Sequence, residues 1–303
     1  MSVDIEIRQG GLLKKSLDLN FLRSICENYS FSYGISNHAF ALDDYKGGKD
    51  IAGVTFIVYN GKKIGRGFNF WLDATKKNCL LRLNNPCADG DVKDFYDFLH
   101  TICEVLKAKT FLQDGDVKSV DDIAQICKDI TMWNRTVLRE QLAGNYAEWC
   151  LFGAVYPIYL EDEFMNQVKA ADDNEAMDIY AKYFHEKQSK DYYYAKPIMY
   201  EDDKGTVFGM YAITEGVRSI FPINPYITMG LGLDVNMKVG SWSVSLGIVD
   251  EGKYETMGKV SFDDFVNNLN LSESTNRFDG KHIIIELSKR DIDMLIEKSA
   301  KTE

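Results

Sequence analysis

Residues 53–72 have the sequence GVTFIVYNGKKIGRGFNFWL. The apolar run Gly53–Tyr59 predicts a strand, and Asn60-Gly61 directly after it favours a two-residue type I′ hairpin turn. That turn requires positive φ at both of its positions, which Gly and Asn adopt more readily than other residues. The extended run Lys62–Leu72 then predicts the second strand of the hairpin.

The segments that follow predict a third strand and two helices. Asn78–Leu83 is a third extended run, in which leucines alternate with Arg82. Asp91–Lys107 carries apolar residues three and four positions apart, which is typical of an amphipathic helix. A second helix is expected over Val120–Leu142, with Ser119 and Asp122 as a capping-box-like start. Together these segments can bury their own apolar surface.

The segments on either side extend this pattern. Val3, Ile5 and Ile7 alternate with acidic residues, which predicts a half-buried strand. A helix over 19–29 and an extended segment over 31–42 are expected next. Beyond the helix expected over Val120–Leu142, the sequence predicts an extended run near 151–160. Helices over 161–171 and 174–186 follow, or one helix broken near Asp172-Asp173.

From residue 192 onward the sequence is rich in strand patterns. Runs at 192–200 and 206–214 flank a turn at Asp203-Lys204-Gly205. Alternating residues at 235–239 and 242–248 flank Gly240-Ser241, which predicts a second two-residue hairpin turn. A further strand is expected at 254–260, and another over 283–287. Ser261 and Ser288 each precede an Asp by three residues and predict helix starts.

These patterns predict an α+β fold in which antiparallel β-meanders pack against amphipathic helices. Two β-rich units are expected, joined by a helical middle. The first covers residues 1–145 and the second residues 146–303, unless the two form one continuous domain.

Charge and composition exclude several classes of function. Among 303 residues, 46 are acidic and 35 basic, and the net charge of −11 repels polyanions. We therefore expect no nucleic-acid binding. No run approaches the roughly 20 apolar residues that span a bilayer, and the N-terminus lacks signal-peptide features. The six cysteines include no Cys-x-x-Cys pair and are typical of buried thiols in a reducing compartment, so we expect a cytoplasmic protein.

Motifs that would indicate catalysis or cofactor binding do not stand out. Gly65-Arg66-Gly67 is the nearest resemblance to a phosphate loop, but neither a dinucleotide fingerprint nor a P-loop is complete. His38, His100, His185 and His282 have no partner at metal-ligand spacing. We therefore expect no metal and no cofactor. A dispersed catalytic site stays open, because its members need not be adjacent in sequence.

Two residues are candidate ligand-binding positions. Arg66 could pair with a carboxylate or phosphate through its planar guanidinium, although a surface arginine on a bent strand is the simpler interpretation. Trp71 could line an apolar pocket beside it. Tyr192-Tyr193-Tyr194 resembles a stacking platform for bases, but a partly buried strand accounts for it better.

Four stretches resemble a known family. KKIGRGFNF, LLRLNNP, DVKDFYDFLHTI and FLQDGDVKSVDDI occur in this order, and the resemblance is best over residues 50–145. The order is similar to that of an uncharacterised bacterial family of domain-of-unknown-function proteins about this long. The resemblance implies a bacterial cytosolic protein. It transfers no functional residue, because the family carries no assigned activity.

Two hypotheses of function remain. The first is a non-catalytic cytosolic interaction protein, either an adaptor or an immunity-type inhibitor, whose partner presents a basic surface. Negative charge and the lack of a catalytic motif favour it. The second is an enzyme or small-ligand-binding protein with a dispersed site, which requires a deep cleft with convergent polar groups. Whether the chain is an enzyme, and what its oligomeric state is, stay undecided by the sequence.

Overall fold

A computed structural model describes residues 1–11, 14, 16–37, 41–144, 149–228, 234, 237–250, 253–269 and 276–300. The chain forms two compact units, Met1–Ser189 and Lys190–Glu303. The boundary therefore lies later than the one expected at residue 145. The helical segment expected to join two β-rich units belongs to the first unit.

The first unit is built on an eight-stranded sheet with the order β3-β2-β4-β5-β6-β1-β7-β8, in which all neighbouring pairs are antiparallel. Its strands are β1 (Ser2–Arg8), β2 (Phe31–Asn37), β3 (Ala41–Asp43), β4 (Phe56–Asn60), β5 (Phe68–Leu72), β6 (Asn78–Asn84), β7 (Thr110–Gln113) and β8 (Asp116–Ser119). The alternation predicted for β1 is confirmed, since Val3, Ile5 and Ile7 are buried.

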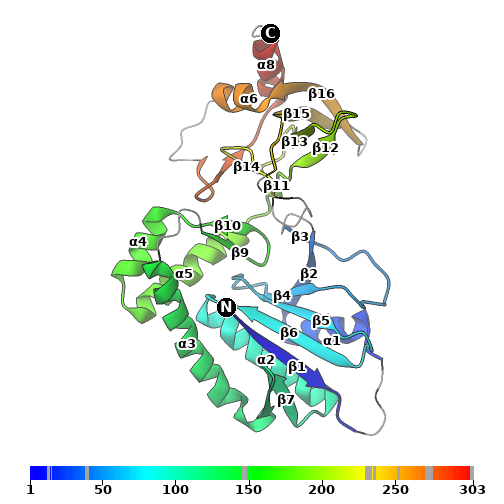
Figure 1. Ribbon diagram of the computed structural model, residues 1–303, viewed down its shortest axis with the longest axis vertical. Coiled ribbons are helices and arrows are strands. Elements are labelled where there is room, and N and C mark those ends of the chain that lie inside the picture. The colour runs from blue at the N-terminus through cyan, green and yellow to red at the C-terminus, as the bar shows by residue number, and fades with distance from the viewer. Residues whose placement is uncertain are drawn as a thin grey trace. The chain divides into compact units, whose positions relative to one another are not determined.

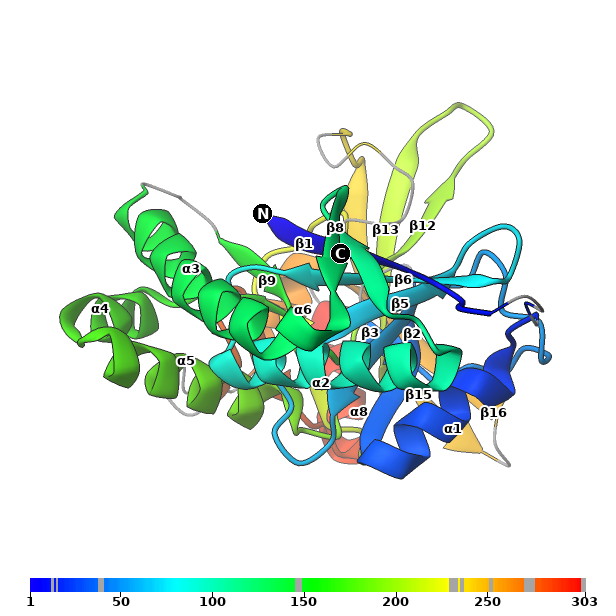
Figure 2. The same cartoon turned by 90° about the horizontal axis from the view of Figure 1, so that it is seen from below.

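Helices cover one face of this sheet (Figure 2). They are α1 (Leu19–Tyr29) and α2 (Asp89–Leu106), while α3 (Ile123–Ala143) follows a 3-10 turn at Val120–Asp122 and packs on α2. The predicted helices in these three places are confirmed. Phe68 on β5 lies at the centre of the core, with ring centroids 5.4 Å from Phe95 and 5.2 Å from Phe98 on α2. Each such buried ring contributes about 2–3 kcal/mol.

The rest of the first unit is a short hairpin and two helices. These are β9 (Cys150–Phe152), β10 (Pro157–Tyr159), α4 (Asp162–Ala170) and α5 (Asp173–Gln188). Tyr180 on α5 donates a hydrogen bond to the Pro86 carbonyl, 3.0 Å away, and Arg139 on α3 donates to the Ala171 carbonyl at 2.7 Å. These bonds tie residues 150–188 to the sheet unit, which explains the position of the boundary.

The hairpin turn expected at Asn60-Gly61 is wrong. The connection from β4 to β5 spans residues 61–67, and Gly67 rather than Gly61 has a positive φ, of 62°. A two-residue turn does occur at Asp114-Gly115 between β7 and β8, where φ is 51° and 91°. Asp-Gly is a sequence signal for this hairpin, which was not among the predicted turns.

In the residues that the structure describes, the second unit contains two sheets and the helices α6 and α8 (Figure 1). One sheet has the order β11-β14-β17 and the other β12-β13-β15-β16. Their strands and the helices are β11 (Tyr193–Tyr194), β12 (Ile198–Glu201), β13 (Val207–Thr214), β14 (Ser219–Pro222), β15 (Ser241–Asp250), β16 (Lys253–Ser261), α6 (Phe262–Asn268), β17 (His282–Ile285) and α8 (Lys289–Ser299). Phe221, Phe262 and Phe265 belong to a core shared by both sheets and both helices.

Two strand pairs in this unit are parallel, contrary to the expected antiparallel meanders. β13 pairs with β15, and β11 pairs with β14, both in parallel. The hairpin turn expected at Gly240-Ser241 is therefore wrong: Ser241 begins β15, and the Gly240 amide donates to the Val207 carbonyl at 2.7 Å. Of the strand expected at 235–239, residues 235 and 236 lie outside the described residues, and 237–239 form no strand.

The helix caps predicted from Ser-x-x-Asp are confirmed at two of three places. Ser261 accepts from the Asp264 amide, and Ser288 with Asp291 forms a reciprocal capping box. Ser119 accepts instead from the Asp121 amide, because the chain there begins with a 3-10 turn. The predicted α+β class holds for the molecule as a whole.

Candidate functional site

Arg66 is buried, with 8% of its surface exposed, so the surface position expected for it is wrong. Its Nε donates to the Phe152 carbonyl at 2.9 Å, and its Nη1 donates to the carbonyls of Pro86 at 2.7 Å and Asn84 at 3.2 Å. The guanidinium thus joins the β9 strand to the end of β6 and to the segment that follows it. A ligand-binding role for Arg66 stays a prediction.

The backbone around Arg66 binds a carboxylate of the protein itself. The amides of Arg66 and Gly67 each donate to Asp91 at 3.1 Å, and the Ala88 amide donates at 3.2 Å. Burial raises the pKa of Asp91, and these hydrogen bonds oppose that effect. The Gly-Arg-Gly segment is therefore an anion-binding loop of the kind that holds phosphate elsewhere, but here the Asp91 side chain occupies it.

Trp71 is half-buried on the face of β5 opposite to the buried Phe70 and Leu72. The Arg82 guanidinium carbon lies 6.0 Å from the Trp71 ring centroid. Arg82 in turn forms a bidentate ion pair with Asp4 at 2.5 and 3.0 Å. Arg66 and Trp71 have different neighbours, so the structure does not assemble them into one site.

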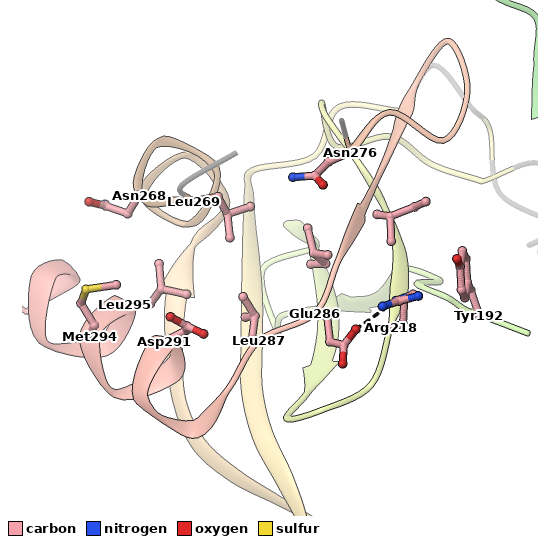
Figure 3. Close-up of a pocket in the computed structure, with 12 residues that line it drawn as sticks. Tyr192, Arg218, Asn268, Leu269, Asn276, Glu286, Leu287, Asp291, Met294 and Leu295 are labelled. Atoms are coloured by element: carbon pink, nitrogen blue, oxygen red, sulfur yellow. Dashed lines mark hydrogen bonds and ion pairs between the residues drawn. The ribbon is translucent and has the colours of Figure 1, made fainter. Parts of the chain in front are cut away.

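A groove of about 510 Å³ lies in the second unit, along β17 and the segment that follows it (Figure 3). We call it the β17 groove. The apolar part of its lining is Leu269 after α6, Ile284, Ile285 and Leu287 on or after β17, and Met294 and Leu295 on α8. Met294 is 39% exposed. Ile285, Leu287 and Leu295 are buried in the core of the unit, so Met294 supplies the exposed apolar surface of the groove.

Polar groups complete the lining of the β17 groove. Arg218 Nε lies 2.9 Å from Glu286 Oε2, and the Arg218 guanidinium carbon lies 5.5 Å from the Tyr192 ring centroid. Figure 3 shows Arg218 and Glu286 pointing toward each other. Asp291 also lines the groove, and hydrogen bonds from the Ser288 side chain and amide lower its pKa, so it is ionised at neutral pH. With two carboxylates and one guanidinium, the charged side chains that line the β17 groove carry a net negative charge.

A buried polar cluster in the same unit joins Asp279, His282, Tyr194 and Tyr226. His282 Nδ1 lies 2.8 Å from Asp279 Oδ1, which also accepts from the amides of His282 and Lys281. His282 Nε2 lies 2.9 Å from the Tyr226 hydroxyl and 3.3 Å from the Tyr194 hydroxyl. The two hydroxyls are 2.9 Å apart.

The chemistry of the cluster follows from its donors and acceptors. A carboxylate only accepts hydrogen bonds, so His282 Nδ1 carries a hydrogen, and in the neutral ring Nε2 accepts from a phenol. Tyr226 is half-buried, whereas His282 is 1% and Asp279 0% exposed. An oriented His beside a partly exposed hydroxyl is the arrangement of a general base. It is equally a way to fix β11, β17 and the segment after β14 against each other.

Sequence reasoning missed both features. In the sequence His282 has no partner at metal-ligand spacing, and Tyr194 belongs to a run of three tyrosines. Asp279 stands three residues before His282, a spacing that the hairpin between them turns into a contact. The β17 groove left no signal at all, because its residues come from five separate segments (192, 218, 268–269, 276 and 284–295) that only the fold brings together.

Three further features of the chain bear on the kind of site. No described group of three or more His, Cys, Asp and Glu side chains could hold a metal ion. No disulfide joins any of the six cysteines, and burial raises the pKa of Cys26 and Cys103 to about 12, which makes them poor nucleophiles. None of the helices in the described residues is both long enough and apolar enough to cross a bilayer.

Comparison with known proteins gives one match. The family described as a domain of unknown function, DUF4299, matches residues 2–295, nearly the whole chain. No curated protein and no solved structure matches the chain. The match extends well beyond residues 50–145, where the sequence resemblance is best.

Proposed function

This chain belongs to the DUF4299 family of domains of unknown function, and we propose that it is a non-catalytic interaction protein that binds a protein partner in the β17 groove. One observation carries the proposal: the groove combines an apolar lining with an exposed methionine and net negative charged groups at the edge of a sheet. Protein partners bind such edges by apolar anchors surrounded by charged residues.

The partner we propose carries a basic segment. Glu286 and Asp291 outnumber Arg218 in the groove, and the whole chain has a net charge of −11. Complementary charge raises the rate of encounter and disfavours acidic competitors. An adaptor or an immunity-type inhibitor in a bacterial cytoplasm fits this description. The absence of disulfides among the six cysteines is in keeping with that compartment.

Site-specific crosslinking in the native host tests this proposal. A photoreactive residue replaces Met294 in the groove, or as the control Met132, which is 70% exposed on α3. We expect position 294 to crosslink one protein, identified by mass spectrometry, that also co-purifies with the unmodified chain, while position 132 does not crosslink it. Equal or absent crosslinking at the two positions contradicts the proposal.

A second candidate function, catalysis, is favoured by the Asp279–His282–Tyr226 arrangement. It predicts that Tyr226 or His282 exchanges a proton with a substrate. The test incubates the protein with a host metabolite extract and measures consumption by mass spectrometry. A metabolite consumed by the wild type and spared by Tyr226→Phe supports catalysis. Consumption of none, or equal consumption by the variant, rejects it.

A further inference from the structure

The eight-stranded sheet of the first unit has a second face, which α1 and α2 do not cover. Strand residues alternate between the two faces of a sheet, and α1 and α2 lie on the side of the buried positions (Figure 2). We call the opposite side, over the strands β4, β5, β6, β1, β7 and β8, the open sheet face. Its larger apolar side chains are half-buried or, at Val117, 69% exposed; they are Ile57, Tyr59, Trp71, Leu80, Leu112 and Val117.

Four of these side chains form one row across the sheet. Trp71 on β5 pairs with Leu80 on β6, and Leu80 pairs with Glu6 on β1. Glu6 pairs with Leu112 on β7, which in turn pairs with Val117 on β8. Paired residues of neighbouring antiparallel strands lie about 5 Å apart on the same face. The open sheet face therefore presents an apolar stripe across five strands, interrupted at Glu6.

The charged side chains of the open sheet face balance each other. In its six strands they are Asp4, Glu6, Arg8 and Arg82. Arg82 pairs with Asp4 at 2.5 and 3.0 Å, and Arg8 pairs with Glu6 at 2.7 Å. Because the whole chain carries a net charge of −11, two copies of it repel each other on average. The open sheet face, with two acidic and two basic groups, adds nothing to that repulsion.

A neutral face with an apolar stripe suits a second copy of the same chain. In a two-fold symmetric dimer the same face of each copy meets its counterpart, so acidic and basic groups present in equal number can pair across the interface. A strongly charged partner would instead meet as many like charges as opposite ones, which costs affinity.

The size of the open sheet face is also close to what a stable dimer needs. Six strands about 4.8 Å apart and about 18 Å long cover a flat area of about 500 Å². The accessible surface is larger than this flat area, because side chains project from it. A standard interface buries roughly 800 Å² of accessible surface on each partner.

We infer that the open sheet face is the contact surface of a homodimer, in which the apolar stripes of two copies pack face to face. Trp71 is a dominant contact in this dimer. The Arg82 guanidinium carbon lies 6.0 Å from its ring centroid, and Trp and Arg are enriched among the residues that carry most of the binding energy of interfaces. The inference does not depend on the β17 groove.

Sedimentation of the full-length protein tests the oligomeric state. We expect dimers above about 10 µM, since standard interfaces have micromolar or tighter affinity. Trp71→Ala should weaken the dimer at least about tenfold. The control is Val105→Ala, at a residue that is 56% exposed on α2, and it should leave the affinity of the dimer unchanged.

Crosslinking locates the contact while Trp71 stays in place. A photoreactive residue replaces Val117, at the exposed end of the apolar stripe, or Val105 as the control. We expect position 117 to join two copies of the chain covalently and position 105 not to do so. If Trp71→Ala changes the circular dichroism of the protein, the crosslinks decide alone.

Three outcomes overturn the inference. They are a monomeric wild type at these concentrations, equal affinity of the Trp71→Ala and Val105→Ala dimers with both variants folded, and equal or absent crosslinking between copies at positions 117 and 105. None of them bears on the proposed function, which the capture of a host protein at position 294 decides separately.

Discussion

Asp94 is a carboxylate whose environment opposes its charge. It lies on α2 and accepts from the Asn60 side chain at 3.5 Å. Burial raises its pKa to about 6, with smaller contributions from Asp91 and Asp97, while the Asn60 bond lowers it. At Asp94 the folded protein therefore binds more protons than the unfolded chain between about pH 4 and pH 6. The contribution of Asp94 to stability falls as pH rises through that window.

Replacing Asp94 by Asn should remove this penalty. Each pKa unit corresponds to about 1.4 kcal/mol, and partial exposure of the side chain reduces the effect. We expect Asp94→Asn to raise the free energy of unfolding by about 1–2 kcal/mol at pH 7 and to leave it nearly unchanged at pH 4. Urea denaturation at both pH values measures this. The control is Asp97→Asn, at an exposed position of the same helix. If Asp97→Asn raises the free energy of unfolding as much as Asp94→Asn does, burial of Asp94 is not the cause.

Arg66 is a structural residue by its contacts, so its replacement should affect stability. A lysine at this position cannot reach three carbonyls of two segments. We expect Arg66→Lys to lower the free energy of unfolding by about 2–3 kcal/mol, because buried acceptors lose charged donors. The matched control is Arg82→Lys, whose side chain is 48% exposed in its pair with Asp4 and should cost less than about 1 kcal/mol. Denaturant titrations measure both variants. If both lose a similar, small free energy of unfolding, the contacts of Arg66 do not contribute to stability as expected.

At the scale of single elements, turns and helix starts place different demands on glycine. Gly115 has a φ of 91° in the β7–β8 turn, where a side chain is strained even though the space around it is open. Gly90 lies exposed in the first turn of α2, and an added Cβ there also meets open space. The two positions thus differ in backbone conformation rather than in crowding.

Alanine substitutions at these two glycines should change stability in opposite directions. We expect Gly115→Ala to lower the free energy of unfolding by about 1–2 kcal/mol, and Gly90→Ala to raise it by about 0.5–1 kcal/mol. Thermal unfolding followed by circular dichroism compares the two variants with the wild type. A Gly115→Ala variant as stable as the wild type contradicts the positive φ of this turn.

At the scale of the whole molecule, each unit has its own hydrophobic core. The core of the first includes Phe68 and Phe95, and that of the second includes Phe221 and Phe265. A domain with its own core can fold alone. We expect separate fragments of residues 1–189 and 190–303 to unfold cooperatively on heating, as measured by calorimetry.

A fragment of residues 1–145 is the comparison for the first unit. It lacks the Phe152 carbonyl that Arg66 binds and the Tyr180 hydroxyl that binds Pro86. We expect it to melt at a lower temperature than fragment 1–189 or to lack a cooperative transition. Equal melting temperatures contradict the boundary at Ser189 and favour the earlier one.

Local patterns in the sequence specify those elements whose signal lies in neighbouring residues. The strand β1, the helices α1 and α2, and the capped helices α6 and α8 follow from alternation, from apolar spacing and from Ser-x-x-Asp. These features depend on which side of an element faces the core, and neighbouring residues encode that side. The α+β class follows from the sum of these elements.

The connections and pairings of those elements depend instead on contacts across the whole fold. Asn60-Gly61 favours a tight turn, yet the loop is longer because Asp91, distant in sequence, binds the amides of Arg66 and Gly67. The β13–β15 pairing is parallel, which Gly240-Ser241 could not indicate. The β17 groove and the contact of His282 with Tyr226 and Tyr194 arise in the same way. Contacts between distant segments depend on packing across the fold, and no short pattern in the sequence encodes them.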